Sequence, residues 1–310
     1  MSTPAEDAPD AVEEAGLTPA EAFALLGNET RIDILQALHE ATVESGHEAV
    51  PFSELYERID LEDSAHFNYH LKQLLEHFVR KTDDGYAFRT AGWKVVRSVF
   101  AGTFTGRAEV GPFDAPGDCY ACGGDLSARY GNEVLTITCD DCGRTAVDYP
   151  FPPGGLDDRT AEEFLDAFHH HVRHHYCLAA DGVCPECMGR METTLDAETN
   201  VPGRELEVHH VCERCDNRLN SAVGLNLLDT APVLNFFSER GHDLTTEPFW
   251  TFDWCVSDAR TTVLAEDPLR IRLDLPADCD TLSVTLDGTL SVLDVCKQEA
   301  GADVEAEAGT

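Results

Sequence analysis

Four Cys-x-x-Cys pairs constrain the fold of this chain more than any other feature of its sequence. Sixteen residues separate the first two pairs, and twenty-four separate the last two. The eight cysteines are Cys119, Cys122, Cys139, Cys142, Cys184, Cys187, Cys212 and Cys215. Two residues between thiolates let both sulfurs of a pair reach one metal ion, and two pairs complete a tetrahedral shell. The spacing therefore predicts two structural zinc (Zn²⁺) ions per chain, in zinc-ribbon-like modules.

Two other uses of cysteine compete with zinc. Disulfide frameworks are typical of short secreted chains, whereas this chain has 310 residues and no signal-peptide pattern. Iron–sulfur clusters also take four thiolates and are the main chemical rival. Zinc is favoured because residues 134–138 read as a strand between two knuckles, and glycines follow Cys122 and Cys142 as the tight knuckle turn requires. A closed four-thiolate shell also leaves no open position for catalysis.

The remaining cysteines and a histidine cluster carry weaker signals. Cys177, Cys255, Cys279 and Cys296 stand alone and are expected to be buried or inert thiols. On a helix expected to begin near Thr160, five histidines lie between positions 169 and 175, so that two pairs share a face at i, i+4 spacing. That spacing can hold a metal ion. A solvated helix face is favoured instead, because no third ligand lies nearby in the sequence, and a metal or pH response stays open.

The charge of the chain is strongly acidic. Asp and Glu outnumber Lys and Arg by 58 to 22, for a net charge of −36, while 43% of the residues are hydrophobic. This combination predicts a folded protein with an acidic surface rather than a disordered acidic chain. Such a surface suits multimolar salt, where the Debye length falls to about 3 Å and self-repulsion is screened. We interpret the source as halophilic, with an ordinary acidic cytosolic protein as the alternative.

Only one window of the chain is basic. Residues 64–107 carry seven basic and three acidic side chains, whereas the segments on both sides are strongly acidic. A local positive patch is expected where a polyanion such as DNA docks. No stretch approaches the roughly 18 to 20 apolar residues of a membrane span, and the N-terminal flank is acidic, so we expect a cytoplasmic protein with no membrane partner.

The block at 17–106 reads as helices followed by a hairpin. Thr18-Pro19 is typical of a helix start, and a second helix follows near Ile32. After a short third helix, apolar residues of a fourth repeat with helical spacing at Phe67, Leu71, Leu74, Leu75 and Phe78. Residues 78–81 and 86–89 flank an Asp-Gly turn, which is a strong hairpin signal, and a last helix begins near Thr90. This order predicts a winged helix-turn-helix.

The same block resembles the ArsR-like winged-helix regulators, particularly the acidic versions typical of haloarchaea. The matching segments are LLGNETRIDIL at 25–35, FNYHLKQL at 67–74 and TAG at 90–92, and the resemblance covers residues 17–105. It implies transcription regulation by sequence-specific binding of double-stranded DNA as a homodimer, with the final helix contributing to the dimer. Founding members sense metals through a cysteine pair before the recognition helix. Here that segment is FSELYER at 52–58, without cysteine, so metal sensing does not carry over.

The fourth helix has the side chains that DNA reading needs. A helix can enter the major groove when one face packs on its domain and the other presents hydrogen-bonding groups. The candidate readers are His66, Asn68, Tyr69 and Lys72, with Ser64 and Gln73 on the same outward face. Arg80, Lys81 and Arg89 lie on the wing and would contact phosphates or the minor groove. The alternative is a module used only for protein docking or dimerisation, and Tyr69 alone could equally be packed.

The C-terminal block reads as a small α+β domain. We expect a helix at 225–240 and strands at 249–255, 261–264, 269–275, 282–286 and 290–295, with a hairpin turn at Asp287-Gly288. The aromatic strand at 249–255 suits a core more than a ligand pocket. No nucleophile elbow, phosphate loop or dinucleotide fingerprint occurs, so an enzyme is not expected.

Together these patterns predict an α+β multidomain protein. The expected parts are a disordered leader at 1–16, the DNA-binding domain at 17–106, a first zinc ribbon at 107–157, a histidine-rich helix with a second ribbon at 158–219, the C-terminal domain at 220–296 and a disordered tail at 297–310. The leading hypothesis is a transcriptional regulator with structural zinc and no catalytic residues. A metal- or redox-responsive sensor that uses the same DNA-binding module is the second hypothesis, and a zinc-dependent enzyme is the third and disfavoured. A small-molecule effector stays open as a partner.

Overall fold

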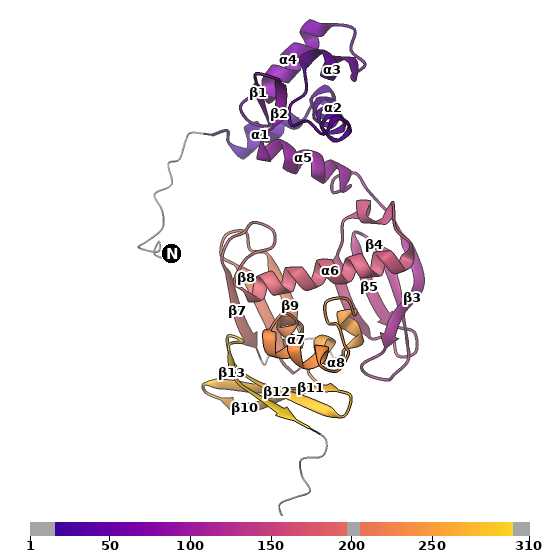
Figure 1. The fold of residues 1–310 in the computed structure, drawn as a ribbon, viewed down its shortest axis with the longest axis vertical. Coiled ribbons are helices and arrows are strands. Elements are labelled where there is room, and N and C mark those ends of the chain that lie inside the picture. The colour runs from indigo at the N-terminus through magenta and orange to yellow at the C-terminus, as the bar shows by residue number, and fades with distance from the viewer. Residues whose placement is uncertain (1–15, 197–204, 300–310) are drawn as a thin grey trace, which may run out of the picture. The chain divides into compact units, whose positions relative to one another are not determined.

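The computed structural model describes residues 16–196 and 205–299. The chain divides into two compact units, Met1–Thr105 and Gly106–Thr310, and each is described by itself below. Figure 1 shows both units as ribbons. The predicted disorder at 1–15 and 300–310 lies outside the described residues. The predicted tail begins too early, because Lys297 belongs to the last strand and its Nζ lies 2.8 Å from Glu239 Oε2.

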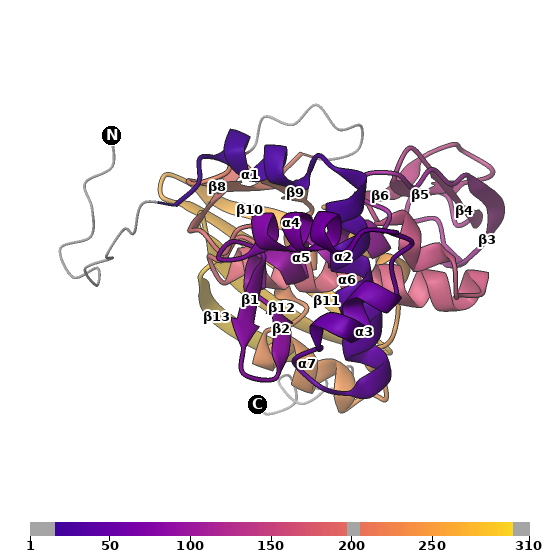
Figure 2. The same cartoon turned by 90° about the horizontal axis from the view of Figure 1, so that it is seen from above.

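The N-terminal unit is a set of short helices with one hairpin. Its elements are α1 (Pro19–Leu26), α2 (Glu29–Ser45), α3 (Phe52–Glu57), α4 (Ser64–Leu74), β1 (Val79–Thr82), β2 (Gly85–Phe88) and α5 (Thr90–Phe100). Thr18 and Glu21 form a capping box at the start of α1. Helix α2 is central and contacts α1, α3, α4, α5 and β2. Figure 2 shows the β1–β2 hairpin projecting from these helices.

Two details of this unit depart from the sequence prediction. Helix α4 ends at Leu74, because Leu75 turns to an extended conformation and Glu76 takes a positive φ of 71°. Phe78 therefore reaches the core from the turn and not from the helix. In the hairpin the two turn residues are Asp83 and Asp84, and Gly85 begins β2. A Cβ at Gly85 would lie 2.2 Å from the Val50 carbonyl oxygen, since Val50 pairs with the next strand residue.

Three antiparallel sheets make up most of the described part of the C-terminal unit. The first contains β3 (Val110–Asp118), β4 (Asp125–Gly131), β5 (Val134–Cys139) and β6 (Thr145–Pro150) in that order. The second contains β7 (Met191–Asp196), β8 (Glu207–Cys212) and β9 (Arg218–Ser221). The third contains β10 (Thr261–Glu266), β11 (Leu269–Ala277), β12 (Asp280–Asp287) and β13 (Val292–Gln298). Each sheet is a simple meander, in which strands that are neighbours in the sheet are consecutive in the sequence.

Helix α6 (Ala161–Ala180) runs through the centre of this unit. It begins where expected, with Thr160 and Glu163 forming a capping box. In Figure 1 it extends from the first sheet to the second, with α7 (Ala231–Ser238) and α8 (Asp253–Val256) beside it. Three 3₁₀ turns complete the unit: η1 (Pro153–Leu156), η2 (Val223–Leu227) and η3 (Phe249–Thr251).

Two predicted elements of the C-terminal block are wrong. The expected strand at 249–255 forms η3 and α8, and Phe249, Trp250 and Trp254 are buried in the core. The aromatic residues alternate along the sequence like those of a strand, but here successive helical turns bury their rings on several sides. The expected helix at 225–240 is broken into η2 and α7, with Pro232 in the first turn of α7.

One hydrophobic core runs through all three sheets and α6 of the C-terminal unit. The N-terminal unit has its own core, to which α2, α3, α4 and the hairpin contribute. The chain is therefore an α+β protein with several antiparallel sheets, as the sequence predicts. No helix among the described residues is both long and apolar enough to cross a membrane.

Candidate metal centres and nucleic-acid surface

The first four-cysteine cluster lies at one end of the first sheet. Cys119 and Cys122 follow β3, while Cys139 ends β5 and Cys142 lies in the turn to β6. The Sγ atoms of Cys119 and Cys142 are 3.7 Å apart, and those of Cys122 and Cys139 are 3.5 Å apart. All four sulfurs lie within 4.8 Å of one another. The sheet thus brings two sequence-distant pairs to one point.

The second cluster repeats this geometry around the second sheet. The Sγ atoms of Cys184 and Cys215 are 3.7 Å apart, and those of Cys187 and Cys212 are 3.5 Å apart. These four sulfurs also lie within 4.8 Å of one another. Asn217 adds a side-chain amide that donates to the sulfur of Cys184 at 3.8 Å. All eight predicted ligands are therefore gathered into two clusters, in the predicted combinations.

All four knuckles share one turn. In each, the first cysteine's amide donates to the carbonyl five residues later, and its carbonyl accepts from the amide four residues later. The residue after the second cysteine has a positive φ: 72° at Gly123, 70° at Gly143, 58° at Met188 and 56° at Asp216. The glycines noted in the sequence serve this left-handed position. The second cluster builds the same turn with two residues that have side chains.

The sulfur distances fit a metal shell better than any covalent alternative. A tetrahedral site with Zn–S bonds of about 2.3 Å separates its sulfurs by about 3.8 Å. The observed separations are close to this value and far above a disulfide bond of about 2.05 Å. Backbone amides of Ala121 and Arg214 donate to the sulfurs of Cys119 and Cys212, each at 3.4 Å. These amides would stabilise thiolate charge, so both clusters are suited to a thiophilic cation.

The thiol pKa values indicate why a cation is needed. Burial raises the pKa of Cys119, but amide hydrogen bonds from Ala121 and Cys122 outweigh it and lower the pKa to about 7. The backbone amide of Asn217 lowers the pKa of Cys215, but the neighbouring thiols outweigh it and raise the pKa to about 12. Four neighbouring thiols therefore cannot all ionise near neutral pH unless a cation neutralises them.

Helix α4 presents part of the predicted DNA-reading set to solvent. Ser64, His66, Tyr69 and Lys72 are exposed, with Tyr69 at 56%, whereas Asn68 and Gln73 are half-buried. The opposite face buries Phe67, Leu71 and Leu74 in the core. Tyr69 is thus exposed and not packed in the core, two alternatives between which the sequence did not decide.

His66 is not a free reader, because it contacts a buried neighbour. Its Nε2 lies 3.0 Å from Nε2 of His70, which is only 6% exposed. Burial, followed by the charges of His66 and Arg31, lowers the pKa of His70. His70 belongs to the matching segment at 67–74 but was not predicted to contact DNA. In the structure it supports His66 through this contact.

The predicted wing cations are exposed but partly engaged. Arg80 forms an ion pair with Glu48, and Arg89 donates to the carbonyl oxygen of Glu76. Lys81 is exposed on β1. The hairpin thus places three cations within ten residues of sequence, two of them held by contacts that a phosphate would have to share or replace.

Most histidines of α6 are buried or half-buried and do not face solvent freely. His169 is fully buried: its Nδ1 accepts from the Phe249 amide at 3.1 Å, and its Nε2 lies 3.4 Å from the Thr245 carbonyl oxygen. Burial lowers the pKa of His169 to about 4 and that of His171 to about 4. His170, His171 and His175 are half-buried. The interpretation as a solvated face is wrong for His169, whereas His174 is exposed. The sequence could not show which segments fold over the helix.

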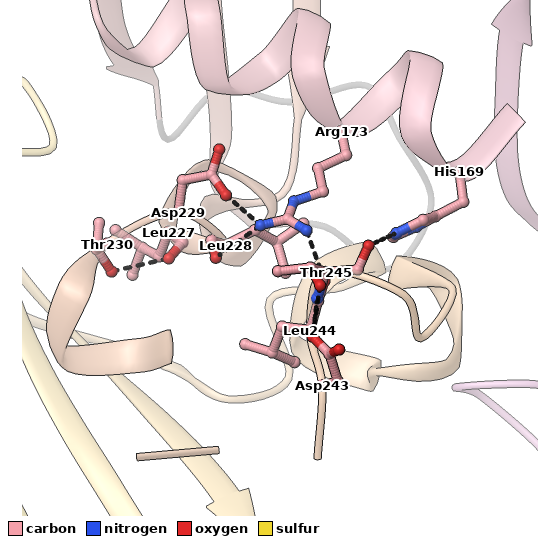
Figure 3. A network of polar contacts seen from close by, with 9 residues as sticks. All are labelled: His169, Arg173, Leu227, Leu228, Asp229, Thr230, Asp243, Leu244 and Thr245. Carbon is pink, nitrogen blue, oxygen red and sulfur yellow. Dashed lines mark hydrogen bonds and ion pairs between the residues drawn. The ribbon is translucent and has the colours of Figure 1, made fainter. Parts of the chain in front are cut away.

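Sequence reasoning also missed Arg173, which is buried in the same helix. Figure 3 shows its guanidinium among the residues around η2 and the loop before η3. It pairs with the Asp229 carboxylate and donates to the carbonyl oxygen of Leu244 at 2.9 Å. An arginine among histidines gives no sequence signal of burial. Of the lone cysteines, Cys177 and Cys255 are buried as expected, whereas Cys279 and Cys296 are exposed because they lie in the β11–β12 turn and on the edge strand β13.

Comparison with known families adds two matches and no function. Residues 19–99 match a family described as Domain of unknown function (DUF7347). Residues 116–292 match a family described as Domain of unknown function (DUF7351). No curated protein matches the chain. Since the second match spans more than half of the 310 residues and includes both four-cysteine clusters, the chain belongs to the family described as Domain of unknown function (DUF7351).

Proposed function

We propose that this protein is a DNA-binding transcriptional regulator, a homodimer in the manner of the ArsR-like winged-helix proteins, and that each chain carries two structural zinc ions. The observation that carries the proposal is α4, which buries one apolar face and exposes Tyr69, Lys72 and His66 on the other. A helix anchored in this way is what major-groove reading requires.

The elements around α4 support this proposal. The order α2, α3, α4, hairpin and α5 is that of a winged helix-turn-helix, with α4 as the recognition helix and β1–β2 as the wing. The basic window at 64–107 contains α4, the hairpin and α5, in a chain whose net charge is −36. An acidic protein that binds DNA needs its cations gathered where the phosphates lie.

An apolar groove on the N-terminal unit supports the homodimer. The groove has a volume of about 430 Å³ and lies between α1 and α5, with Phe23, Val99 and Phe104 among its walls. Phe23 and Phe104 are each 69% exposed. Exposed aromatic side chains around a groove mark a surface that is covered in the working molecule. We assign the groove to a second copy of the chain, because the resemblance to ArsR-like regulators implies that the final helix contributes to the dimer.

The metal in both four-cysteine clusters is proposed to be zinc in a structural role. Four thiolates close the tetrahedral shell, so no position remains for a reacting water or substrate. Each cluster also joins two turns that adjoin strands of its sheet. A regulator with structural metal sites fits these features better than a zinc enzyme does.

Selection of bound sequences from random double-stranded oligonucleotides, carried out with the full-length protein in about 2 M KCl, tests the DNA-binding proposal. We expect one enriched sequence, a changed preference for Tyr69→Ala, and weaker binding to all sequences for Lys81→Ala. Arg129→Ala is the matched control, since it removes an exposed arginine from β4 in the other unit. If no sequence is enriched, or if Tyr69→Ala and Lys81→Ala bind like the control, α4 and the hairpin are not a DNA-reading surface.

Light scattering of the purified protein tests the dimer separately. Phe104→Glu places a charge in the groove and should yield a monomer. Val43→Glu is the control, because Val43 is 66% exposed on α2 and does not line the groove. A monomeric unmodified protein, or a dimer that survives Phe104→Glu, would exclude this groove as the dimer contact.

A further inference from the structure

A histidine-lined cleft lies along one side of α6 in the C-terminal unit. It has a volume of about 480 Å³. His170, His171, His174 and His175 line it from the helix, and Phe151 and Arg159 contribute from the other side. The i, i+4 spacing places these histidines as two adjacent pairs on one helix face. The cleft is separate from both four-cysteine clusters, since no cysteine lines it.

One of the two pairs is held in place by β6. The ring centroids of His171 and His175 are 4.1 Å apart. The carbonyl of Pro150 accepts a hydrogen bond from His171, and the Tyr149 hydroxyl lies 2.8 Å from His175 Nδ1. Residues of β6 therefore engage one nitrogen of each ring, and an imidazole has a second nitrogen with which it can bind a metal ion. This is how ligating histidines are arranged when outer groups fix their orientation.

The other pair is held less firmly. The rings of His170 and His174 are 6.3 Å apart, and His174 is exposed. His170 Nε2 lies 3.6 Å from Oδ1 of Asp166, which belongs to the same helix. This contact therefore does not tie the pair to another element, as Tyr149 ties His175 to β6. The two pairs share helix, spacing and cleft but differ in outer contacts, which makes the second pair a matched control for the first.

We propose that His171 and His175 bind a divalent transition-metal ion of the kind that imidazole prefers, and that Tyr149 and Pro150 orient the two ligands. Two histidines at i, i+4 on a helix can bind one metal ion. Among the described residues, groups of three or more metal-binding side chains occur only at the cysteine clusters, so this site has two protein ligands. Its remaining coordination positions open on the cleft. The bound ion should consequently exchange readily, unlike zinc enclosed by four thiolates.

Nickel binding to the untagged, full-length, zinc-loaded protein tests this site, because imidazole nitrogen is a good ligand for Ni²⁺. Equilibrium dialysis followed by elemental analysis should give two zinc ions and one nickel ion per chain. A His171→Ala/His175→Ala variant should lose the nickel ion and keep both zinc ions. The His170→Ala/His174→Ala variant should retain nickel. Tyr149→Phe should weaken nickel binding by roughly 10- to 100-fold, as expected when an outer contact of a ligand is lost.

Two further variants separate this site from its rivals. His175→Gln retains a polar partner for Tyr149, so loss of nickel in this variant cannot be ascribed to a disrupted fold when the zinc content and circular dichroism are unchanged. His66→Ala tests the other i, i+4 histidine pair, on α4, and should retain nickel. Nickel binding that survives loss of both His171 and His175, that disappears with His66→Ala, or that displaces zinc from the cysteines would overturn the proposal.

Discussion

Replacing Arg173 by methionine should destabilise the C-terminal unit by about 2–4 kcal/mol. The side chain is 3% exposed, and its guanidinium donates to the carbonyl oxygens of Leu244 at 2.9 Å and Leu228 at 3.4 Å (Figure 3). A hydrogen bond to a charged group contributes about 1.5–3 kcal/mol, and both carbonyls lose their donor in the variant. Relief of the cost of burying the charge offsets part of this loss. Methionine retains most of the side-chain volume, so packing changes little.

Asp229→Asn is the informative partner substitution. The Asp229 side chain is 44% exposed, so solvent screens its interaction with Arg173 and also reaches the guanidinium when the carboxylate is removed. We expect a loss of about 1–2 kcal/mol, below that of Arg173→Met. Once Arg173 is absent, Asp229 has no cation to pair with in this network. The double variant should therefore be no less stable than Arg173→Met alone, which corresponds to a coupling of about 1 kcal/mol or more.

Urea unfolding in about 2 M KCl measures these differences. Trp250 and Trp254 report on the C-terminal unit when Trp93, in the other unit, is replaced by phenylalanine. With a slope of about 2 kcal/mol per molar urea, Arg173→Met should lower the midpoint by about 1–2 M. A loss below about 0.5 kcal/mol, or additive effects in the double variant, would show that Arg173 does not hold η2 and the following loop on α6.

Three other outcomes are expected. Purified protein should contain two zinc ions per chain, and Cys122→Ser should reduce this to about one; iron in place of zinc would contradict the assignment. Met188→Gly should raise the thermal midpoint, because Met188 has a φ of 58° and its side chain is 63% exposed. Gly123→Ala should lower the free energy of unfolding by about 1 kcal/mol, because Gly123 has a φ of 72° and no atom lies within 4 Å of the added Cβ. If both substitutions changed stability in the same direction, backbone strain would be excluded as the cause. Burial lowers the pKa of His169 from 6.5 to about 4, so between these values the folded protein keeps this ring neutral while the unfolded chain takes up a proton. The stability present above pH 6.5 is therefore lost as the pH falls toward 4, by up to about 1.4 kcal/mol per pH unit. Urea midpoints between pH 7.5 and 5.5, with zinc content monitored, should fall less steeply for His169→Gln than for the unmodified protein.

Local sequence signals predicted the parts of the structure that local physics determines. Thr18-Pro19 and the Thr160–Glu163 box mark helix starts, because both satisfy amides of the first turn. The Cys-x-x-Cys spacing predicted both clusters, because each knuckle closes its own turn through hydrogen bonds that span only four or five residues. The apolar repeat of α4 predicted which face is buried, though not that the helix would end at Leu74.

Features that depend on distant segments could not be read in the same way. His171 is oriented by Pro150, and His169 by Phe249, which lies 80 residues later in the chain. The aromatic segment at 249–255 alternates like a strand, yet its rings are divided among helical turns packed on other elements. No local pattern distinguishes a charged helix face in water from one that other segments cover. The cleft on α6 was missed for this reason.

The placement of the eight cysteines connects metal binding to the stability of the whole C-terminal unit. In every knuckle the first cysteine is buried, at Cys119, Cys139, Cys184 and Cys212, whereas the second is half-buried or exposed. All four buried sulfurs belong to the same hydrophobic core, which also contains α6 and the third sheet. A metal ion in either cluster would therefore join the core to the surface, and a chelator could approach only from the outer cysteines. Removing the ion would leave buried thiols at the end of a sheet that packs on the rest of the core. Loss of either metal should therefore lower the free energy of unfolding of the whole unit and not that of one cluster alone.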